Sequence, residues 1–457
     1  MEYNHIKVKN VQTPLCRLGG FTWLTLSSKS ILPEPAYVLW AYICINIISW
    51  MISRLYRFLK KKIVHSPWEK MIDAIALILA GGTAMSQMET LIRPDKALQL
   101  SFSRAQYAHS ALIQDMLDGC TPETVLQLQQ KSGSLYYHHG QALQHDFSHQ
   151  LLTLDLDLTG LLASKRAESS TKGYFAHHPG AYGRQLCRVI ATSYQEIVCQ
   201  SLLPGDTPSQ VTLKPAILQM QQILHLSKAQ QQRTLLRWDA GFGTDKNINW
   251  MLTQDYQVLG KVFAHGRVSK LRRTVSKWLP TPSSPGREVA IVDKPHRYAR
   301  KTRQYVVRTP KKTNTWAYGA LVTTLMDLDP FEVVDLYDER GGGIETDFRS
   351  DRQGLGLAKR RKHRMAAQQI LIELGGRAHN LLVWTAKQLG APISQYGMVK
   401  LVRDAFQVNG YVLFAQDRPI EIGLNLRHPL ACALYDGFNQ LFSGQPQMKL
   451  WDPVEPV

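Results

Sequence analysis

The stretch LLTLDLDLTG at residues 151–160 alternates apolar and polar side chains, a pattern typical of a half-buried β-strand. Two further strands are predicted at GYFAHH (173–178) and RQLCRVIAT (184–192). A turn at 179–183 that contains proline and glycine joins them. Three consecutive strands with short connections predict an antiparallel meander.

Helices and strands alternate after this meander. The segment 213–232 predicts a helix with Pro215 in its first turn, and TLLRWDAGFG (234–243) predicts a strand that ends in a glycine-rich turn. KNINWMLTQD (246–255) predicts a helix and YQVLGKVFA (256–264) a strand. This order predicts an α/β core, a mixed sheet flanked by helices.

The segments on either side of the core differ in composition. Apolar residues recur at helical spacing from 36 to about 145, whereas positions 261–313 hold 15 Lys or Arg but only two acids. EVAIV, RQYVVR and WAYGALVTTL predict strands after position 287, and a helical pattern returns at 344–390. We therefore expect a helical N-terminal domain (1–145), a first core segment (146–260), a basic β-rich insertion (261–330), a second core segment (331–395) and a C-terminal extension (396–457).

The overall composition favours a polyanionic partner. The chain has 457 residues with 54 Lys+Arg against 36 Asp+Glu, a net charge of +18, and nucleic acid is the commonest polyanion. A hydrophobic content of 44% excludes a disordered chain. Six cysteines without a CxxC pair exclude a disulfide scaffold and an obvious structural zinc site.

One apolar run, at residues 36–52, raises the question of a membrane span. Its 17 residues are at the lower edge of a spanning length, and a basic segment follows. Polar residues recur at helical spacing through and beyond it, which predicts an amphipathic helix packed on protein; they are Asn46, Ser49, Ser53, Arg57 and Lys60. No signal peptide is predicted. We expect a protein without a membrane anchor, with a membrane span as the alternative.

Acidic residues mark several positions in the α/β core. Asp155 and Asp157 share one face of the first strand, and Asp239 ends a later strand where α/β proteins often bind ligands. Glu345 is expected to open a helix that carries Phe348, Arg349 and Arg352 on the same face.

These acids suggest a metal site built from two strand aspartates and one helix glutamate. Carboxylate oxygens are the ligands that Mg²⁺ prefers, and two such ions can promote phosphodiester cleavage. The alternative is that each acid is a turn residue or a helix cap, which is the commoner role of an isolated aspartate at a strand end. Spacing alone leaves both interpretations open.

Several motifs in order resemble the bacterial insertion-sequence DDE transposases. They are LDLDLTG, RWDAGFGTDKNINWML, YDERGGGIETDFRSDRQGLGLAKRRKH and AHNLLVW. The resemblance runs from about 80 to 390. It is strongest to the cut-and-paste subgroup, whose last acid lies in a Tyr-x2-Arg-x3-Glu-x6-Lys signature.

The resemblance implies a catalytic and metal-binding trio of Asp157, Asp239 and Glu345. Asp155 then becomes a structural neighbour, and Asp245, a competitor for the second position, is better interpreted as a helix N-cap. Tyr337 and Arg340 match the signature's Tyr and Arg.

This sequence departs from the signature at two places. Four residues separate Arg340 from Glu345 where the pattern has three, and Arg352 stands where Lys is usual. We expect the extra glycine to form a bulge before the helix, and Arg352, which keeps the positive charge, to bind phosphate in place of the lysine. A catalytically decayed, transposase-derived DNA-binding protein is the alternative.

The resemblance further implies a ribonuclease-H-like core with two Mg²⁺ ions, for which Mn²⁺ can substitute. The expected partners are double-stranded DNA, as terminal inverted repeats and target, and a second copy of the chain in a dimeric synaptic complex with a hairpin intermediate. The expected location is the bacterial cytoplasm, in association with the nucleoid. The residues expected to contact DNA are Tyr337, Arg340, Arg349, Arg352, Lys359, Arg360, Arg361 and Trp316.

Some of these residues have a competing structural interpretation. Trp316 is a candidate for stacking on an extruded base, with Trp278 as its rival, although a buried core position is the commoner role of a tryptophan. The basic run at 357–364 favours contact with the DNA backbone because it is expected to share a helical region with Arg349 and Arg352. The pairs His138–His139 and His177–His178 and the thiols of Cys187 and Cys199 are predicted to be structural.

Overall fold

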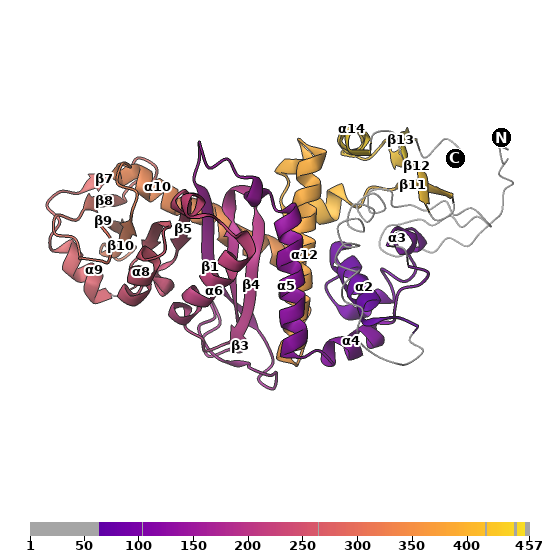
Figure 1. Ribbon diagram of the computed structural model, residues 1–457, viewed down its shortest axis with the longest axis horizontal. Coiled ribbons are helices and arrows are strands. Elements are labelled where there is room, and N and C mark those ends of the chain that lie inside the picture. The colour runs from indigo at the N-terminus through magenta and orange to yellow at the C-terminus, as the bar shows by residue number, and fades with distance from the viewer. Residues whose placement is uncertain (1–63, 103, 264, 416–417, 443–445, 453–457) are drawn as a thin grey trace. The chain divides into compact units, whose positions relative to one another are not determined.

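The structure is a computed structural model that describes residues 64–102, 104–263, 265–415, 418–442 and 446–452 (Figure 1). The chain forms two compact units. The larger unit comprises residues 81–85 and 111–384, and the smaller one comprises the described residues in 64–80, 86–110 and 385–452. Every residue of the predicted site belongs to the larger unit.

The amphipathic helix predicted at 36–52 lies outside the described residues. Within the ranges that the structure describes, no helix is long and apolar enough to cross a membrane.

A mixed sheet forms the centre of the larger unit. Its first five long strands follow the spatial order β4-β3-β1-β5-β6. The neighbours β1, β5 and β6 run parallel, whereas β3 is antiparallel to both β1 and β4. The bounds are β1 (Leu152–Leu162), β3 (Tyr182–Ala191), β4 (Glu196–Pro204), β5 (Thr234–Trp238) and β6 (Gln257–Lys261). This arrangement confirms the predicted mixed sheet flanked by helices.

The basic segment after position 261 extends the same sheet. Strand β10 (Trp316–Thr323) pairs antiparallel with β6, and β9 (Arg303–Pro310) then pairs with β10. The last strands in this direction are β8 (Glu288–Ile291) and the short β7 (Leu279–Pro280). The three strands predicted after position 287 are present. The helix α9 (His265–Arg272), which was not predicted, precedes them.

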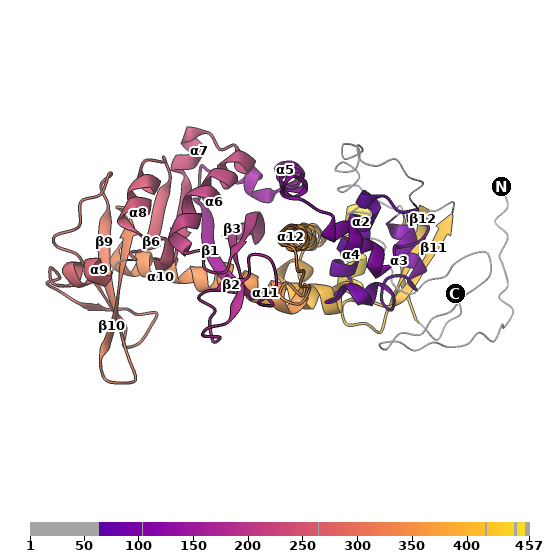
Figure 2. The ribbon, with the colours of Figure 1, turned by 90° about the horizontal axis from the view of Figure 1, so that it is seen from below.

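Helices cover both faces of the sheet. Figure 2 shows α6 (Ser209–Leu224) and α8 (Asp245–Leu252) on one face, and α10 (Pro330–Arg340) and α11 (Thr346–Gly354) on the other. The remaining helices of this unit are α5 (Pro122–His139), α7 (Lys228–Gln232) and most of α12 (Met365–Leu389), while α4 (Ser110–Asp118) begins at the boundary of the units.

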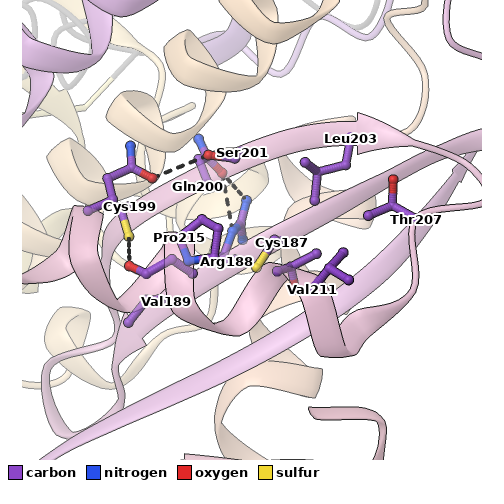
Figure 3. A pocket seen from close by; sticks show the side chains of 13 residues that line it. Cys187, Arg188, Val189, Cys199, Gln200, Ser201, Leu203, Thr207, Val211 and Pro215 are labelled. Atoms are coloured by element: carbon purple, nitrogen blue, oxygen red, sulfur yellow. Dashed lines mark hydrogen bonds between the residues drawn. The ribbon is translucent and has the colours of Figure 1, made fainter. Parts of the chain in front are cut away.

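Alternate residues of β3 pack against different helices, because side chains along a strand point to opposite faces. Leu186 and Ile190 join a hydrophobic core with Phe348 of α11. On the opposite face, Cys187 lines a small pocket together with Pro215 of α6 (Figure 3). The sheet is therefore buried on both sides.

The smaller unit combines helices and a short sheet. Strands β11 and β12 are antiparallel, and β12 and β13 are parallel. Its elements are α2 (Pro67–Leu79), α3 (Lys96–Ser101), α13 (Met398–Lys400), β11 (Gly410–Ala415), β12 (Arg418–Asn425), α14 (Ala431–Phe442) and β13 (Gln447–Trp451).

Two sequence predictions in the core were wrong. The strand predicted at 173–178 is absent because the chain turns there, with His177 at φ +64° after the short β2 (Thr171–Lys172). The second antiparallel partner of β3 is instead β4, which was not predicted. Most of its residues are buried, so its sequence lacks the apolar–polar alternation of a half-exposed strand.

The helix predicted at 213–232 also differs from the structure. Helix α6 begins at Ser209, so Pro215 lies inside it rather than in its first turn. It ends at Leu224 because His225 adopts φ +49°, and α7 begins separately behind the cap residue Ser227. The described residues 64–145 contain helices but no strand, and the domain boundaries stay a prediction.

We predict that Gly260→Ala destabilises the sheet between β5 and β6. A Cβ at position 260 would lie 2.1 Å from an atom of the buried Trp238 ring, and overpacking of this kind costs about 1–3 kcal/mol. The control is Gly319→Ala on β10, where a Cβ meets nothing within 4 Å. Urea unfolding of both variants measures the difference, and equal midpoints would contradict the prediction.

Candidate active site

Asp157 lies on β1 at a position where its charge is poorly solvated. Its side chain is 18% exposed, and its Oδ2 lies 3.3 Å from the Arg340 guanidinium. Oδ1 accepts a hydrogen bond of 2.7 Å from the Leu158 amide. Burial raises the pKa of Asp157 to about 6, against the lowering effect of Arg340, and the charges of Asp239 and Glu345 raise it further.

Asp239 and Glu345 are exposed at the ends of two other elements. Asp239 follows β5 and precedes the 3-10 turn Ala240–Phe242, and Glu345 ends a π-helical turn before α11. The structure thus brings Asp239 and Glu345 close enough to Asp157 for their charges to raise the pKa of Asp157. Among the described residues, however, no three or more His, Cys, Asp or Glu side chains are grouped closely enough to hold a metal ion.

Tyr337 and Arg340, the other two signature residues, are one turn apart on α10 and are buried. The Arg340 guanidinium donates to the Leu156 carbonyl at 3.2 Å in addition to facing Asp157. The Tyr337 ring lies 4.8 Å from the ammonium of Lys261, and burial raises the pKa of its hydroxyl well above the usual range. Arg340 therefore pairs with Asp157 from the buried side, and Tyr337 packs beside Arg340.

The extra residue between Arg340 and Glu345 is accommodated by a π-helical turn at Gly341–Glu345. The helical geometry is broken inside this turn at Gly343, whose φ of −85° and ψ of −106° are not helical, and α11 begins after the kink with Glu345 at its N-cap position, as expected. A Cβ at Gly343 would lie 2.7 Å from Thr192 Cγ2 and 3.1 Å from Asp155 Oδ2. The turn thus packs directly on β1 and on the loop after β3.

Asp155 is a structural residue, as predicted. It is fully buried and forms a two-point ion pair with Arg237 of β5, with Nε–Oδ1 at 2.7 Å and Nη2–Oδ2 at 2.9 Å. The Thr192 hydroxyl donates to Oδ2 at 2.6 Å. The same carboxylate therefore contacts two strands and the π-helical turn.

A second buried charge network holds α11 to the sheet. Arg188 of β3 lies 2.5 Å from Asp347 and 2.8 Å from Asp351, one turn apart on α11. His379 of α12 lies 2.7 Å from Asp351 and 3.3 Å from Asp347. Burial alone would lower the pKa of His379, but the two aspartates raise it to about 9, against the opposing charge of Arg188. The protonated histidine and Arg188 together balance two carboxylates.

The exposed side of α11 carries the predicted arginines. Arg349 is exposed, and Arg352 donates to the Thr159 hydroxyl at 2.7 Å and to the Gly160 carbonyl at 2.9 Å. Phe348 turns into the core instead of sharing this face. Arg352 is thus fixed to β1, two residues beyond Asp157.

The basic run at 357–364 is not helical, contrary to the prediction of one helical region at 344–390. Helix α11 ends at Gly354, and Gly356 adopts φ +61°, which turns the chain before α12 begins at Met365. Lys359 and Arg361 are exposed. Arg360 is buried and donates to the Gly82 carbonyl at 2.6 Å, so it is not available to a DNA backbone.

Trp316 lies at the start of β10 and is 37% exposed. The Arg308 guanidinium lies 4.4 Å from its ring and 4.2 Å from the ring of Trp278. Arg308 also pairs with Glu288. Neither tryptophan is a buried core residue, so the core interpretation is wrong for both.

The remaining predicted positions have structural roles. The N-cap of α8 is Thr244 rather than Asp245, which instead pairs with Arg267 at 2.5 Å. Cys187 and Cys199 are buried free thiols, as predicted. The histidine pairs belong to no metal-binding group among the described residues.

Sequence reasoning missed Arg237, Arg188 and His379. A signal was present, because Arg237 stands in TLLRW and Arg188 in LCRVIA, both apolar strand sequences. A charge that strand alternation places inside a core must be paired. The sequence does not show which acids supply the partners, since those lie far along the chain.

The residues 51–443 match the family model described as Transposase DDE domain group 1. The chain therefore belongs to this family of DDE-domain transposases, which confirms the prediction of a DDE transposase domain over most of its length. No curated protein matches the chain.

Two solved structures are similar to the chain at low identity. A cryo-EM structure of the piggyBac transposase synaptic complex with hairpin DNA is 14% identical, with a TM-score of 0.45 and coverage of 82% of each chain. A crystal structure of a pre-cleavage Mos1 transpososome is 14% identical, with a TM-score of 0.17, and the match covers 47% of this chain and 66% of that one. Likeness at this level bears on neither the function nor the detailed geometry.

We predict that His379 makes stability depend on pH. Its folded pKa of about 9 exceeds the ordinary value of 6.5, so its contribution is complete below about pH 6.5 and is lost as pH rises through 9. The difference corresponds to roughly 3 kcal/mol. Urea unfolding at pH 6, 7.5 and 9 measures the loss, and His379→Asn is expected to flatten it. An equal loss in that variant would contradict the assignment.

Proposed function

We propose that this protein is a DNA transposase that cuts phosphodiester bonds at the ends of an insertion-sequence element and joins the freed 3′ hydroxyl to target DNA. The observation that carries the proposal is that, in a chain of the DDE family, Asp157 lies on β1, Asp239 follows β5 and Glu345 precedes α11, with the latter two close enough to act on Asp157. Three carboxylates gathered from distant parts of a chain repel one another. Such a grouping is stabilised when a cation binds it.

The proposed metal ligands are these same three residues. The donor set fits Mg²⁺ in type, because it offers only hard carboxylate oxygens. Burial is the main cause of the raised pKa of Asp157, and a bound cation would offset the further contribution from the charges of Asp239 and Glu345. We propose two Mg²⁺ ions, replaceable by Mn²⁺; when bound, they would activate the attacking oxygen and stabilise the leaving one. The protein's own contribution is to hold the three carboxylates on separate rigid elements.

We further propose that the core is ribonuclease-H-like and that the chain belongs to the cut-and-paste subgroup with a hairpin intermediate. The strand order β4-β3-β1-β5-β6, with β3 antiparallel, supports the core assignment. The placement of Tyr337 and Arg340 at the end of α10 and of Glu345 at the start of α11 supports the subgroup. We propose that the helical region up to 145 recognises the terminal repeats, and that a homodimer forms the synaptic complex.

The proposed DNA surface consists of exposed cations beside the carboxylates. Arg349, Lys359 and Arg361 are available, and Arg352 lies next to Asp157 through Thr159. The basic insertion would extend phosphate contacts along the element end, and Trp316 is exposed enough to stack on a base. Tyr337 and Arg340 act on the phosphate site indirectly, because both are buried.

We predict that the protein cleaves a supercoiled plasmid carrying the element's own ends in the presence of Mg²⁺. Asp239→Ala and Glu345→Ala should each lower the cleavage rate at least about a hundredfold, because each removes stabilisation of the transition state. Binding to the ends, measured by gel shift, should persist. The control is Asp327→Ala, an exposed acid in the loop before α10.

The outcomes separate the two candidate activities. End binding without cleavage by the unaltered protein, in Mg²⁺ and in Mn²⁺, would favour the decayed DNA-binding protein. Cleavage that survives both substitutions would contradict the site assignment.

We predict that Gly343→Ala lowers cleavage more than it lowers end binding. The added Cβ would collide with Thr192 and crowd Asp155, which displaces the turn that carries Glu345. A loss of about tenfold or more is expected from a displacement near 1 Å. Gly342→Ala is the matched control, because a Cβ there meets nothing within 4 Å. Equal rates for the two variants would show that the close contact at Gly343 does not matter.

A further inference from the structure

Each of the three proposed metal ligands lies two residues after a residue of, or next to, one buried ion pair. Asp155 precedes Asp157 on β1, Arg237 precedes Asp239 at the end of β5, and Gly343 precedes Glu345 in the π-helical turn. Asp155 pairs with Arg237, and Gly343 approaches Asp155. The spacing of the ligands is thus connected to a single buried ion pair.

The ion pair fixes the two strands that carry the aspartates. Asp155 and Arg237 are direct partners in the parallel register of β1 and β5, and their side chains are 0% and 1% exposed. Both guanidinium–carboxylate contacts are shorter than 3 Å. A planar two-point contact restrains orientation as well as distance, which a single contact does not.

The same pair also contacts α10, the helix that precedes the turn carrying Glu345. The remaining Nη1 of Arg237 donates to the Leu336 carbonyl on α10 and lies 3.4 Å from Glu339. On the other side, Asp155 Oδ2 lies where a Cβ of Gly343 would come within 3.1 Å. Arg237 therefore holds the end of α10, and Asp155 lies against the π-helical turn that follows it.

We propose that Asp155 and Arg237 are positioning residues that set the separation of Asp157, Asp239 and Glu345 and thereby the affinity of the site for a divalent cation. This inference rests on the proposed function. Overall stability does not explain the pair, because a buried ion pair is often no more stabilising than apolar residues of the same volume. What apolar residues cannot reproduce is the directional contact among β1, β5 and α10.

The test is the paired replacement Asp155→Leu/Arg237→Met, which removes both charges together and leaves neither partner uncompensated. The probe is Mn²⁺ alone, with free ion measured by electron paramagnetic resonance in the absence of DNA. We expect a thermal midpoint close to that of the unaltered protein and a Mn²⁺ Kd weakened by about tenfold to a hundredfold. Plasmid cleavage should fall in parallel.

The matched control is Glu373→Leu/Arg377→Met, which replaces another buried ion pair in the same unit. That pair spans 3.0 Å within α12 and connects no two elements of the site. It should leave the Mn²⁺ Kd unchanged. An unchanged Kd in the Asp155/Arg237 variant as well would overturn the inference.

A second variant decides the question if the paired replacement does not fold. Arg237→Lys keeps the buried positive charge but loses the two-point contact. We expect weaker Mn²⁺ binding at a retained thermal midpoint; an unaltered Kd would overturn the inference. Failure of the unaltered protein to bind Mn²⁺ and to cleave DNA would instead overturn the proposed function.

Discussion

A charge inside a sheet must be paired, and this requirement shapes the core of the protein. Arg237 on β5 and Arg188 on β3 belong to one buried sheet, and each forms ion pairs with acids from other elements. Arg188 pairs with Asp347 and Asp351 of α11, and the same two aspartates pair with His379 of α12. Arg237 pairs with Asp155 of β1 and donates a hydrogen bond to the Leu336 carbonyl near the end of α10. The helices on this face are thereby fixed by directional contacts as well as by apolar packing, which alone permits sliding.

The segment from Pro330 to Gly354 shows how this constraint accommodates a sequence change. An insertion in a regular helix would rotate everything after it by about 100°. The π-helical turn, with its kink at Gly343, confines the extra residue to Gly341–Glu345, so Tyr337 and Arg340 remain buried and Asp347 and Asp351 still contact Arg188. Gly343 lets the backbone approach Thr192 at a point where a side chain would not fit.

Much of this architecture could be predicted from the sequence, but the accuracy differs from one element to the next. The alternation in LLTLDLDLTG predicts β1 correctly because a half-buried strand has a clear period, and the short apolar run before Asp239 predicts β5 because a glycine-rich turn bounds it. β4 was missed since its residues are buried on both faces, and the strand predicted at 173–178 was wrong because periodicity does not report the positive φ of His177. For the site, local motifs indicate Asp157, Asp239 and Glu345. The partners of Arg237 and Arg188 depend on tertiary contacts that no local pattern contains.

The hydrogen-bonded continuity between β6 and β10 has a mechanical consequence. Since the strands β7 to β10 belong to the same sheet as β5, no flexible joint separates the outer strands from the strand that ends at Asp239. A force applied at the start of β10, around Trp316, is transmitted to the core through the backbone hydrogen bonds between β10 and β6, which resist shear along the strands. The outer strands therefore act as a stiff lever attached to the core, and whatever binds at the tip is held at a fixed distance from the carboxylates.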